Sequence, residues 1–232
     1  MRRKNIVLVV AAHPDDEILG CGGTMTKHVD HGDDVHILFL SSGVGARGDD
    51  TDESNDERTR RRRAATAAAK TVGAYPPRFA DFPDNQMDSV PLLDIVKAIE
   101  NVVSEIGPGI VFTHHGGDLN IDHRRAYEAT LTACRPLPGS PVEQICTYEV
   151  LSSTEWGPFA ADRMFLPNRF VEVTGQMDRK LSALSAYEEE LRPSPHARSI
   201  EAVKAQAILR GASVGVPCAE AFATMRSIWN DR

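Results

Sequence analysis

Residues 13–17, HPDDE, place one histidine and three carboxylates in five consecutive positions. They follow an apolar run of strand length and lead directly into a stretch with helical periodicity. Pro14 fixes its own φ and restricts His13 to extended conformations, so the chain turns sharply between them. The turn lets His13 and Asp16 point toward a common spot, with Asp15 beside them. An imidazole and a carboxylate placed in this way are the start of a metal site, and a catalytic zinc ion requires a third protein ligand.

Helix capping is the simpler explanation for acids at these positions. Carboxylates stabilise helix N-termini, so Asp15 or Asp16 could serve only the helix that begins there. Capping accounts for one aspartate, but it does not account for His13 together with two further acids. For Glu17 two roles stay open, support of a metal ligand and a first-turn acid favoured by the helix dipole.

A second polar cluster, THHGGDLNIDH at residues 113–123, also follows an apolar run. Ligands of open α/β sheets collect beyond the carboxyl ends of the strands, so both clusters should open on the same edge. His123 is the preferred third ligand, because a loop-to-helix junction can hold a side chain firmly. His114 and His115 come directly off the strand, and either could line a pocket or support a ligand.

Together the two clusters resemble the zinc-dependent LmbE-like, or PIG-L-type, N-deacetylases, over roughly residues 1–135. The family motif (A/P)HPDDE corresponds to residues 12–17, and a polar loop that ends in Asp-His corresponds to residues 118–123. The resemblance implies that His13, Asp16 and His123 bind Zn²⁺ and that Asp15 is the general base. Zinc lowers the pKa of a bound water to about 7, and a carboxylate that stays off the metal can take the proton of that water.

The chain departs from the family at Asn120, where many members carry a histidine three positions before the last zinc ligand. An asparagine amide can donate a hydrogen bond to an oxyanion, so we expect Asn120 to be catalytic, but it cannot protonate a leaving amine. The general acid is therefore open among Asp15, His114, His115 and His196.

Four residues are expected to bind substrate: Arg47, Asp118, His114 and His196. Arg47 corresponds to a position where the family often has an arginine near the substrate, although a solvated loop arginine is an equal alternative. His196 lies in a proline-bracketed loop that suits the wall of a pocket, or simply connects two helices. Trp156 could stack on a sugar ring or pack at the edge of the core.

Apolar runs of strand length alternate with helical stretches along the chain, which is typical of a parallel sheet covered by helices. We expect one α/β domain over residues 1–232, a Rossmann-like three-layer sandwich with a mostly parallel sheet, as the LmbE-like resemblance also implies. The expected strands are 6–12, 35–40, 79–84, 110–113, 144–153 and 169–174. The expected helices are 16–30, 58–72, 92–106, one from about 122, 177–191 and 199–209, with a polar loop at 41–57 and a turn at 211–216.

The composition narrows the partners. A net charge of −7 argues against nucleic acid, and the lack of a basic amphipathic stretch argues against stable membrane association. Four widely spaced cysteines without a CxxC pair predict reduced thiols in a cytoplasmic protein, and the first apolar run is short for a signal peptide. The arginines at 58 and 60–63 should pair with the acids before them, or one of them could reach a substrate phosphate.

The sequence thus predicts a zinc-dependent hydrolase that removes the acetyl group from an N-acetylated amino sugar or its conjugate, of the N-acetylglucosamine type. Two alternatives are another metal-dependent amidase and a phosphoester hydrolase with a second metal. A third is a non-catalytic sugar- or nucleotide-binding module. It is disfavoured because Gly20, Gly22 and Gly23 fall inside a helix, where they permit close packing, and do not form a GxGxxG turn. Homo-oligomerisation is compatible with the sequence.

Overall fold

A seven-stranded sheet forms the centre of the computed structural model, which describes residues 4–43 and 52–229. The strands are β1 (Ile6–Ala11), β2 (Asp34–Ser41), β3 (Arg78–Phe82), β4 (Ile110–His114), β5 (Gln144–Tyr148), β6 (Arg169–Glu172) and β7 (Ala219–Ser227). Their order is β3-β2-β1-β4-β5-β7-β6. The first five are parallel, and β7 runs antiparallel to both β5 and β6. The prediction of a mostly parallel sheet is confirmed.

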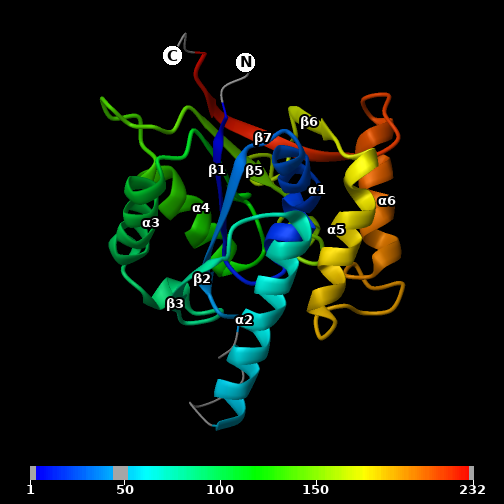
Figure 1. Cartoon of the computed structure of the whole chain (residues 1–232), viewed down its shortest axis with the longest axis horizontal. Helices are drawn as coiled ribbons and strands as arrows, with labels where there is room; N and C mark the ends of the chain where they lie inside the picture. Colours follow the sequence, from blue (N-terminus) through cyan, green and yellow to red (C-terminus); the bar gives the residue numbers. More distant parts are fainter. Residues whose placement is uncertain (1–3, 44–51, 230–232) are drawn as a thin grey trace.

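Helices cover both faces of this sheet, which gives the expected three layers (Figure 1). One face carries α1 (Asp16–Asp30), α2 (Asp52–Val72), α5 (Met177–Leu184) and α6 (Ile200–Ala212), and the other carries α3 (Leu92–Ile106) and α4 (Ile121–Ala133). Short 3₁₀ helices, η1 (Met87–Ser89), η2 (Thr154–Trp156), η3 (Thr174–Gln176) and η4 (Ser185–Tyr187), lie in the connections.

The apolar run of β1 is buried on both sides because this strand lies between two layers. Val7, Val9 and Ala11 face the cluster that α1 and α2 complete, whereas Leu8 and Val10 face the cluster that α3 and α4 complete. Successive side chains of a strand point to opposite faces, so a strand covered on both faces is apolar throughout. The continuous apolar sequence before His13 is therefore that of an inner parallel strand.

The direction of chain progression through the sheet reverses between β1 and β4. From β1 the chain moves outward through β2 to β3, and from β4 it moves the other way to β5. The crevice beyond the carboxyl ends of the strands at such a switch point is where open α/β sheets bind ligands. The two polar clusters follow β1 and β4, so this topology brings them together.

Several predicted boundaries were wrong. Helix α2 begins at Asp52, so residues 52–57 are helical where a loop was predicted. Strand β5 ends at Tyr148, and α5 ends at Leu184, where it continues as η4. Helix α6 continues to Ala212, into the predicted turn. Such ends depend on packing partners that are distant in sequence.

Strand β7 was not predicted at all. Its sequence, AEAFATMRS, is rich in alanine and carries a glutamate and an arginine, a composition with low strand propensity. It becomes an inner strand only because β5 and β6 pair with it on either side.

The cysteines are free, as predicted, with Cys21, Cys134 and Cys146 buried and Cys218 half-buried. Within residues 4–43 and 52–229, none of the helices combines the length and the apolar composition that crossing a bilayer requires.

Candidate metal centre

The turn from β1 into α1 holds Asp15 in an unusual backbone conformation, with φ at 114° and ψ at −31°. Such a conformation costs a non-glycine residue about 1–3 kcal/mol and persists only where neighbouring contacts impose it. Here the Asp15 N–H donates to Glu17 Oε2 at 3.0 Å, and the Asp15 carbonyl accepts from Leu19 N–H at 2.9 Å. The Asp15 side chain makes no capping hydrogen bond, so capping does not explain this aspartate.

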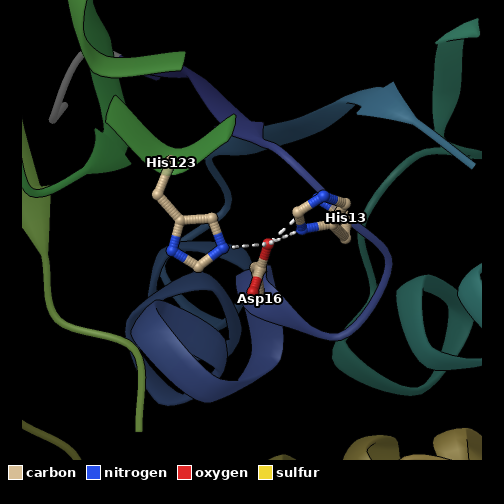
Figure 2. Close-up of side chains that lie close together, drawn as sticks. All are labelled: His13, Asp16 and His123. Atoms are coloured by element: carbon tan, nitrogen blue, oxygen red, sulfur yellow. Dashed lines mark hydrogen bonds and ion pairs between the residues drawn. The ribbon is translucent and has the colours of Figure 1, made fainter. Parts of the chain in front are cut away.

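Three side chains from the two clusters meet behind this turn (Figure 2). Asp16 Oδ2 lies 3.3 Å from His13 Nδ1 and 3.3 Å from His123 Nε2, and each residue offers one ligand atom within 4.8 Å of the others. Asp16 and His123 are fully buried. Asp16 Oδ1 and His123 Nε2 have no hydrogen-bond partner among the described residues. Because buried polar atoms are normally paired, a cation held by these three residues fits the arrangement.

His123 is oriented by a carboxylate on its other nitrogen. Asp118 Oδ1 lies 3.2 Å from His123 Nδ1, which turns Nε2 toward Asp16. Asp118 is itself fixed, because it accepts hydrogen bonds from Ser153 Oγ, from Thr154 Oγ1 at 2.6 Å and from Asn120 N–H at 2.9 Å. This is how proteins commonly orient a metal-ligating histidine. Asp118 is fully buried, so it supports His123 from behind. This position does not fit the predicted contact of Asp118 with substrate.

His13 is oriented in the same way by two carboxylates. Its Nε2 lies 3.0 Å from Asp122 Oδ2 and 3.1 Å from Asp84 Oδ1. His13, Asp84 and Asp122 therefore form a second group with spacing that could hold a metal. Asp122, however, already accepts the N–H of Asn85 at 2.7 Å and that of Met87 at 3.0 Å. These bonds favour Asp122 as a support for His13 and for the loop after β3.

His114 does not fit the predicted contact with substrate either. It is fully buried, its ring stacks on His123 at 3.9 Å between centroids, and Nε2 accepts the Ala12 N–H at 2.8 Å. A backbone N–H can only donate, so Nε2 carries no proton. Burial and the neighbouring His123 hold the pKa of His114 well below its ordinary value. His114 is thus a neutral ring that packs behind His123.

The three ligand candidates stabilise one another in their charged forms, Asp16 as a carboxylate and the two histidines as protonated rings. Burial opposes the charge of Asp16, yet the His123 ring and the contacts with His123 and His13 hold its pKa well below its usual range. Burial also opposes the charge of His123, but Asp16 and Asp118 raise its pKa to about 9. The pKa of His13 is likewise well above its ordinary value, because hydrogen bonds to Asp122, Asp16 and Asp84 outweigh its burial. A metal cation bound by these residues would replace the ring protons that face Asp16.

Asp15 and Glu17 are two further buried acids beside the ligand candidates. Burial raises the pKa of Asp15 to about 7, although the Arg198 guanidinium opposes the shift. Burial raises the pKa of Glu17 to about 8, against the hydrogen bond that Tyr187 Oη–H donates to Glu17 Oε1 at 2.6 Å. Of the two roles left open for Glu17, the structure favours support, because its carboxylate holds the backbone N–H of Asp15.

Arg198 is a site residue that the sequence interpretation missed. Its Nη1 lies 3.0 Å from Asp15 Oδ2 and 2.8 Å from Glu190 Oε2, and its Nε donates to Ser152 Oγ at 2.7 Å. The proline-bracketed loop does form a wall of the site, but through Arg198. The predicted residue of that loop, His196, does not line the cleft; its Nδ1 accepts the Arg198 N–H, and its ring stands edge-on to Trp156.

A polar cleft of about 330 Å³ opens in front of Asp15 and His13. Its walls come from the β1–α1 turn, the stretch after β2, α2, the loop after β3, the start of α4 and the segment after η4, and they include Gly43, Glu57, Arg61, Asp84, Asn85, Asn120, Glu189, Glu190, Arg192 and Arg198. Asn120 thus lies where predicted. Arg47 lies outside the described residues.

Three arginines of α2 pair mainly with acids that are distant in sequence. Arg61 pairs with Glu190, and Glu57 is 3.9 Å away. Arg62 pairs with Asp81, and its guanidinium lies over the ring of Phe79. The predicted pairing with the preceding acids is therefore found for Arg61 and Glu57, while Arg60, Arg61 and Arg62 pair with acids of other segments.

The fold and the site define an α/β protein with a candidate metal centre at the switch point of its sheet. A family model for GlcNAc-PI de-N-acetylases (PIG-L) matches residues 8–134. The chain belongs to this family and is a hydrolytic N-deacetylase.

Individual relatives agree with this assignment. The chain is 30% identical over 157 residues to the uncharacterized deacetylase YaiS of Escherichia coli strain K12, a match that covers 66% of this chain and 77% of the relative. It is 27% identical over 194 residues to diacetylchitobiose deacetylase of Thermococcus kodakarensis, which covers 79% of this chain and 69% of the relative. The solved structure of N,N'-diacetylchitobiose deacetylase from Pyrococcus horikoshii has the same fold, with a TM-score of 0.77 over 96% of this chain and 84% of that chain at 21% identity.

Proposed function

We propose that the protein removes the acetyl group from an N-acetylated amino sugar of the N-acetylglucosamine type, or from its conjugate. We further propose that His13, Asp16 and His123 hold a Zn²⁺ ion for this reaction. The proposal is supported by two buried atoms on a nitrogen–oxygen ligand set in a family of N-deacetylases: Asp16 Oδ1 has no hydrogen-bond partner among the described residues, and His123 Nε2 has only the 3.3 Å ion-pair contact with Asp16 Oδ2. A set of two histidines and one carboxylate is typical of hydrolytic zinc.

When bound, zinc supplies Lewis acidity, which polarises an amide carbonyl and lowers the pKa of a water. Asp15 is our proposed general base. Arg198 fixes one oxygen of its carboxylate, Oδ2, while Oδ1 makes no hydrogen bond with the residues described and is available to accept a proton from water. The imposed backbone conformation of Asp15 helps to hold this carboxylate in the lining of the cleft.

The structure also narrows the choice of general acid. His114 is buried behind His123, His115 Nε2 bonds to the carbonyl of Arg163 at 2.8 Å, and His196 does not line the cleft. Asp15 is the remaining candidate that lines it. We therefore propose that Asp15 delivers the proton it has accepted to the leaving amine.

The walls of the cleft favour a small sugar. Carboxylates, guanidinium groups and amides line it, and sugar hydroxyl groups can donate to carboxylates and accept from guanidinium and amide N–H groups. Its volume is within the range of small-molecule sites. One relative acts, by its name, on diacetylchitobiose, which is a substrate of this class. The cytoplasmic location and the homo-oligomerisation expected from the sequence stay predictions.

The test is acetate release from N-acetylglucosamine, diacetylchitobiose and inositol- and nucleotide-linked N-acetylglucosamine, with protein that is purified, stripped by chelator and reloaded with zinc. We expect turnover of at least one substrate with about one ion per chain, loss on stripping, and recovery on reloading. If the completely stripped protein still turns over the whole panel, the proposal is contradicted. Two ions per chain together with phosphoester hydrolysis would instead favour a second metal on His13, Asp84 and Asp122.

A further inference from the structure

Two asparagine side chains meet at the wall of the cleft: Asn120, which the sequence predicts in the site, and Asn85, which it does not. Asn120 is the N-cap residue of α4, and its Oδ1 accepts the Asp122 N–H at 2.8 Å. Its Nδ2 donates to Asn85 Oδ1 at 3.0 Å. Both residues line the cleft beside Asp15 and His13.

The backbone fixes which atom of each amide is oxygen and which is nitrogen. The Asp122 N–H can only donate, so the Asn120 atom that faces it is the oxygen. The other terminal atom of Asn120 is then the NH₂ group, so the Asn85 atom that faces it is also an oxygen. It follows that the NH₂ group of Asn85 is directed away from Asn120. It makes no hydrogen bond with the residues that the structure describes.

The loop that carries Asn85 is held firmly in place. The N–H groups of Asn85 and Met87 both donate to the buried carboxylate of Asp122, and Asn85 has a positive φ of 51°. The preceding residue, Asp84, lies 3.1 Å from His13 Nε2. Residues at the start of α4 thus orient both the backbone and the side chain of Asn85. Asn85 also directly follows Asp84, the carboxylate that supports His13. A donor held in this way loses little entropy when it binds an acceptor.

We propose that Asn85 is a specificity-determining residue, whose side-chain NH₂ group donates a hydrogen bond to an acceptor oxygen of the N-acetylated substrate. Asn120 is its positioning residue, because it holds Asn85 Oδ1 and so directs the NH₂ group into the cleft. This inference rests on the proposed function for the nature of the substrate. It differs from the expectation that Asn120 itself is the donor, since one N–H of the Asn120 NH₂ group is already bonded to Asn85 Oδ1, whereas the Asn85 NH₂ group makes no hydrogen bond with the described residues.

Asn85→Asp is the sharpest variant, because it is nearly isosteric. One carboxylate oxygen still accepts from Asn120, and the other replaces the NH₂ donor with an acceptor. Asn85→Gly removes the side chain, tolerates the positive φ and keeps the backbone N–H on Asp122. We expect kcat/KM on the best substrate to fall roughly 10- to 100-fold in both variants, with unchanged zinc content and melting temperature. Asn101→Asp, on the exposed face of α3, makes the same chemical change outside the cleft and should leave kcat/KM unchanged.

The positioning role of Asn120 is tested by Asn120→Ser, which keeps an N-cap acceptor and removes the donor to Asn85. If Asn120 acts through Asn85, this change lowers kcat/KM less in the Asn85→Gly background than in the wild type. Equal losses in both backgrounds would overturn that role.

Failure of this inference is distinguishable from failure of the proposed function. Wild-type protein that releases no acetate contradicts the proposed function before any variant is compared. Binding of diacetylchitobiose, measured by calorimetry, tests the donor without turnover, and we expect Asn85→Asp to weaken it roughly tenfold or more. If Asn85→Asp keeps the kcat/KM and the affinity of the wild type, the inference is overturned while the proposed function stands. The same holds if activity and affinity fall only because the variant loses zinc or folded protein.

Discussion

Asp15 and Asp16 are adjacent, yet the structure gives their carboxylates different surroundings. Asp16 faces two histidine nitrogens, whereas Asp15 faces the Arg198 guanidinium and the cleft. We therefore expect Asp15→Asn to keep about one zinc ion per chain and to lower kcat by about 10²- to 10⁴-fold, the usual contribution of a general base. Metal analysis and acetate release measure both quantities. Asp16→Asn is the matched variant, which should lose the metal, and loss of zinc in Asp15→Asn would show that Asp15 is a ligand.

The residues of the site differ in how far the sequence could predict them. His13, Asp16 and His123 lie in two local motifs, and these motifs follow strands that the topology makes neighbours. Arg198 has no local signal, because contacts with Ser152 and Glu190 place it. Asp118 and His114 were assigned to substrate because a sequence shows a polar residue but not the depth at which it is buried.

Helix α1 is kinked within the glycine-rich stretch that follows the motif. Cys21 has φ at −146° and ψ at 22°, which interrupts the helical hydrogen bonds. Glu220 of β7 accepts the freed N–H groups of Gly23 at 2.8 Å and Thr24 at 2.6 Å, and Lys180 donates to the Leu19 carbonyl at 2.9 Å. The sequence predicted the bounds of α1 but not its kink, because the groups that satisfy the kink come from α5 and from the unpredicted β7.

Gly20 allows this helix to pack closely on the sheet. A Cβ atom at this position would lie 2.2 Å from the ring of Tyr148, which is itself fully buried beside His114. We expect Gly20→Ala to lower the free energy of unfolding by about 1–3 kcal/mol through overpacking, despite the better helix propensity of alanine. Urea denaturation measures the change. Gly175→Ala is the control, since a Cβ there meets no atom within 4 Å, and an equal effect of both changes would contradict the packing explanation.

On the scale of the whole molecule, the part beyond the family match completes the site. The match ends at residue 134, yet Arg198, Ser153 and Glu190 come from the later segment and support Asp15 and His123. Lys180 and Glu220, both nearly fully buried and 2.6 Å apart, join that segment to α1. Such contacts across the chain are why we propose a single domain over residues 1–232.

A single domain unfolds in one transition, and Lys180→Met tests this because it leaves Glu220 buried without its cation. We expect the free energy of unfolding to fall by about 3–5 kcal/mol, the usual result of breaking a buried ion pair.

Both tryptophans, Trp156 and Trp229, lie beyond the family match, so fluorescence follows that segment while circular dichroism follows the whole chain. The unfolding transitions measured by the two signals should shift together, because loss of the Lys180–Glu220 ion pair weakens one cooperative core. Arg179→Met breaks the neighbouring, more exposed pair with Asp30 and should cost about 0–1 kcal/mol. Separate transitions for the two signals would instead divide the chain into two domains.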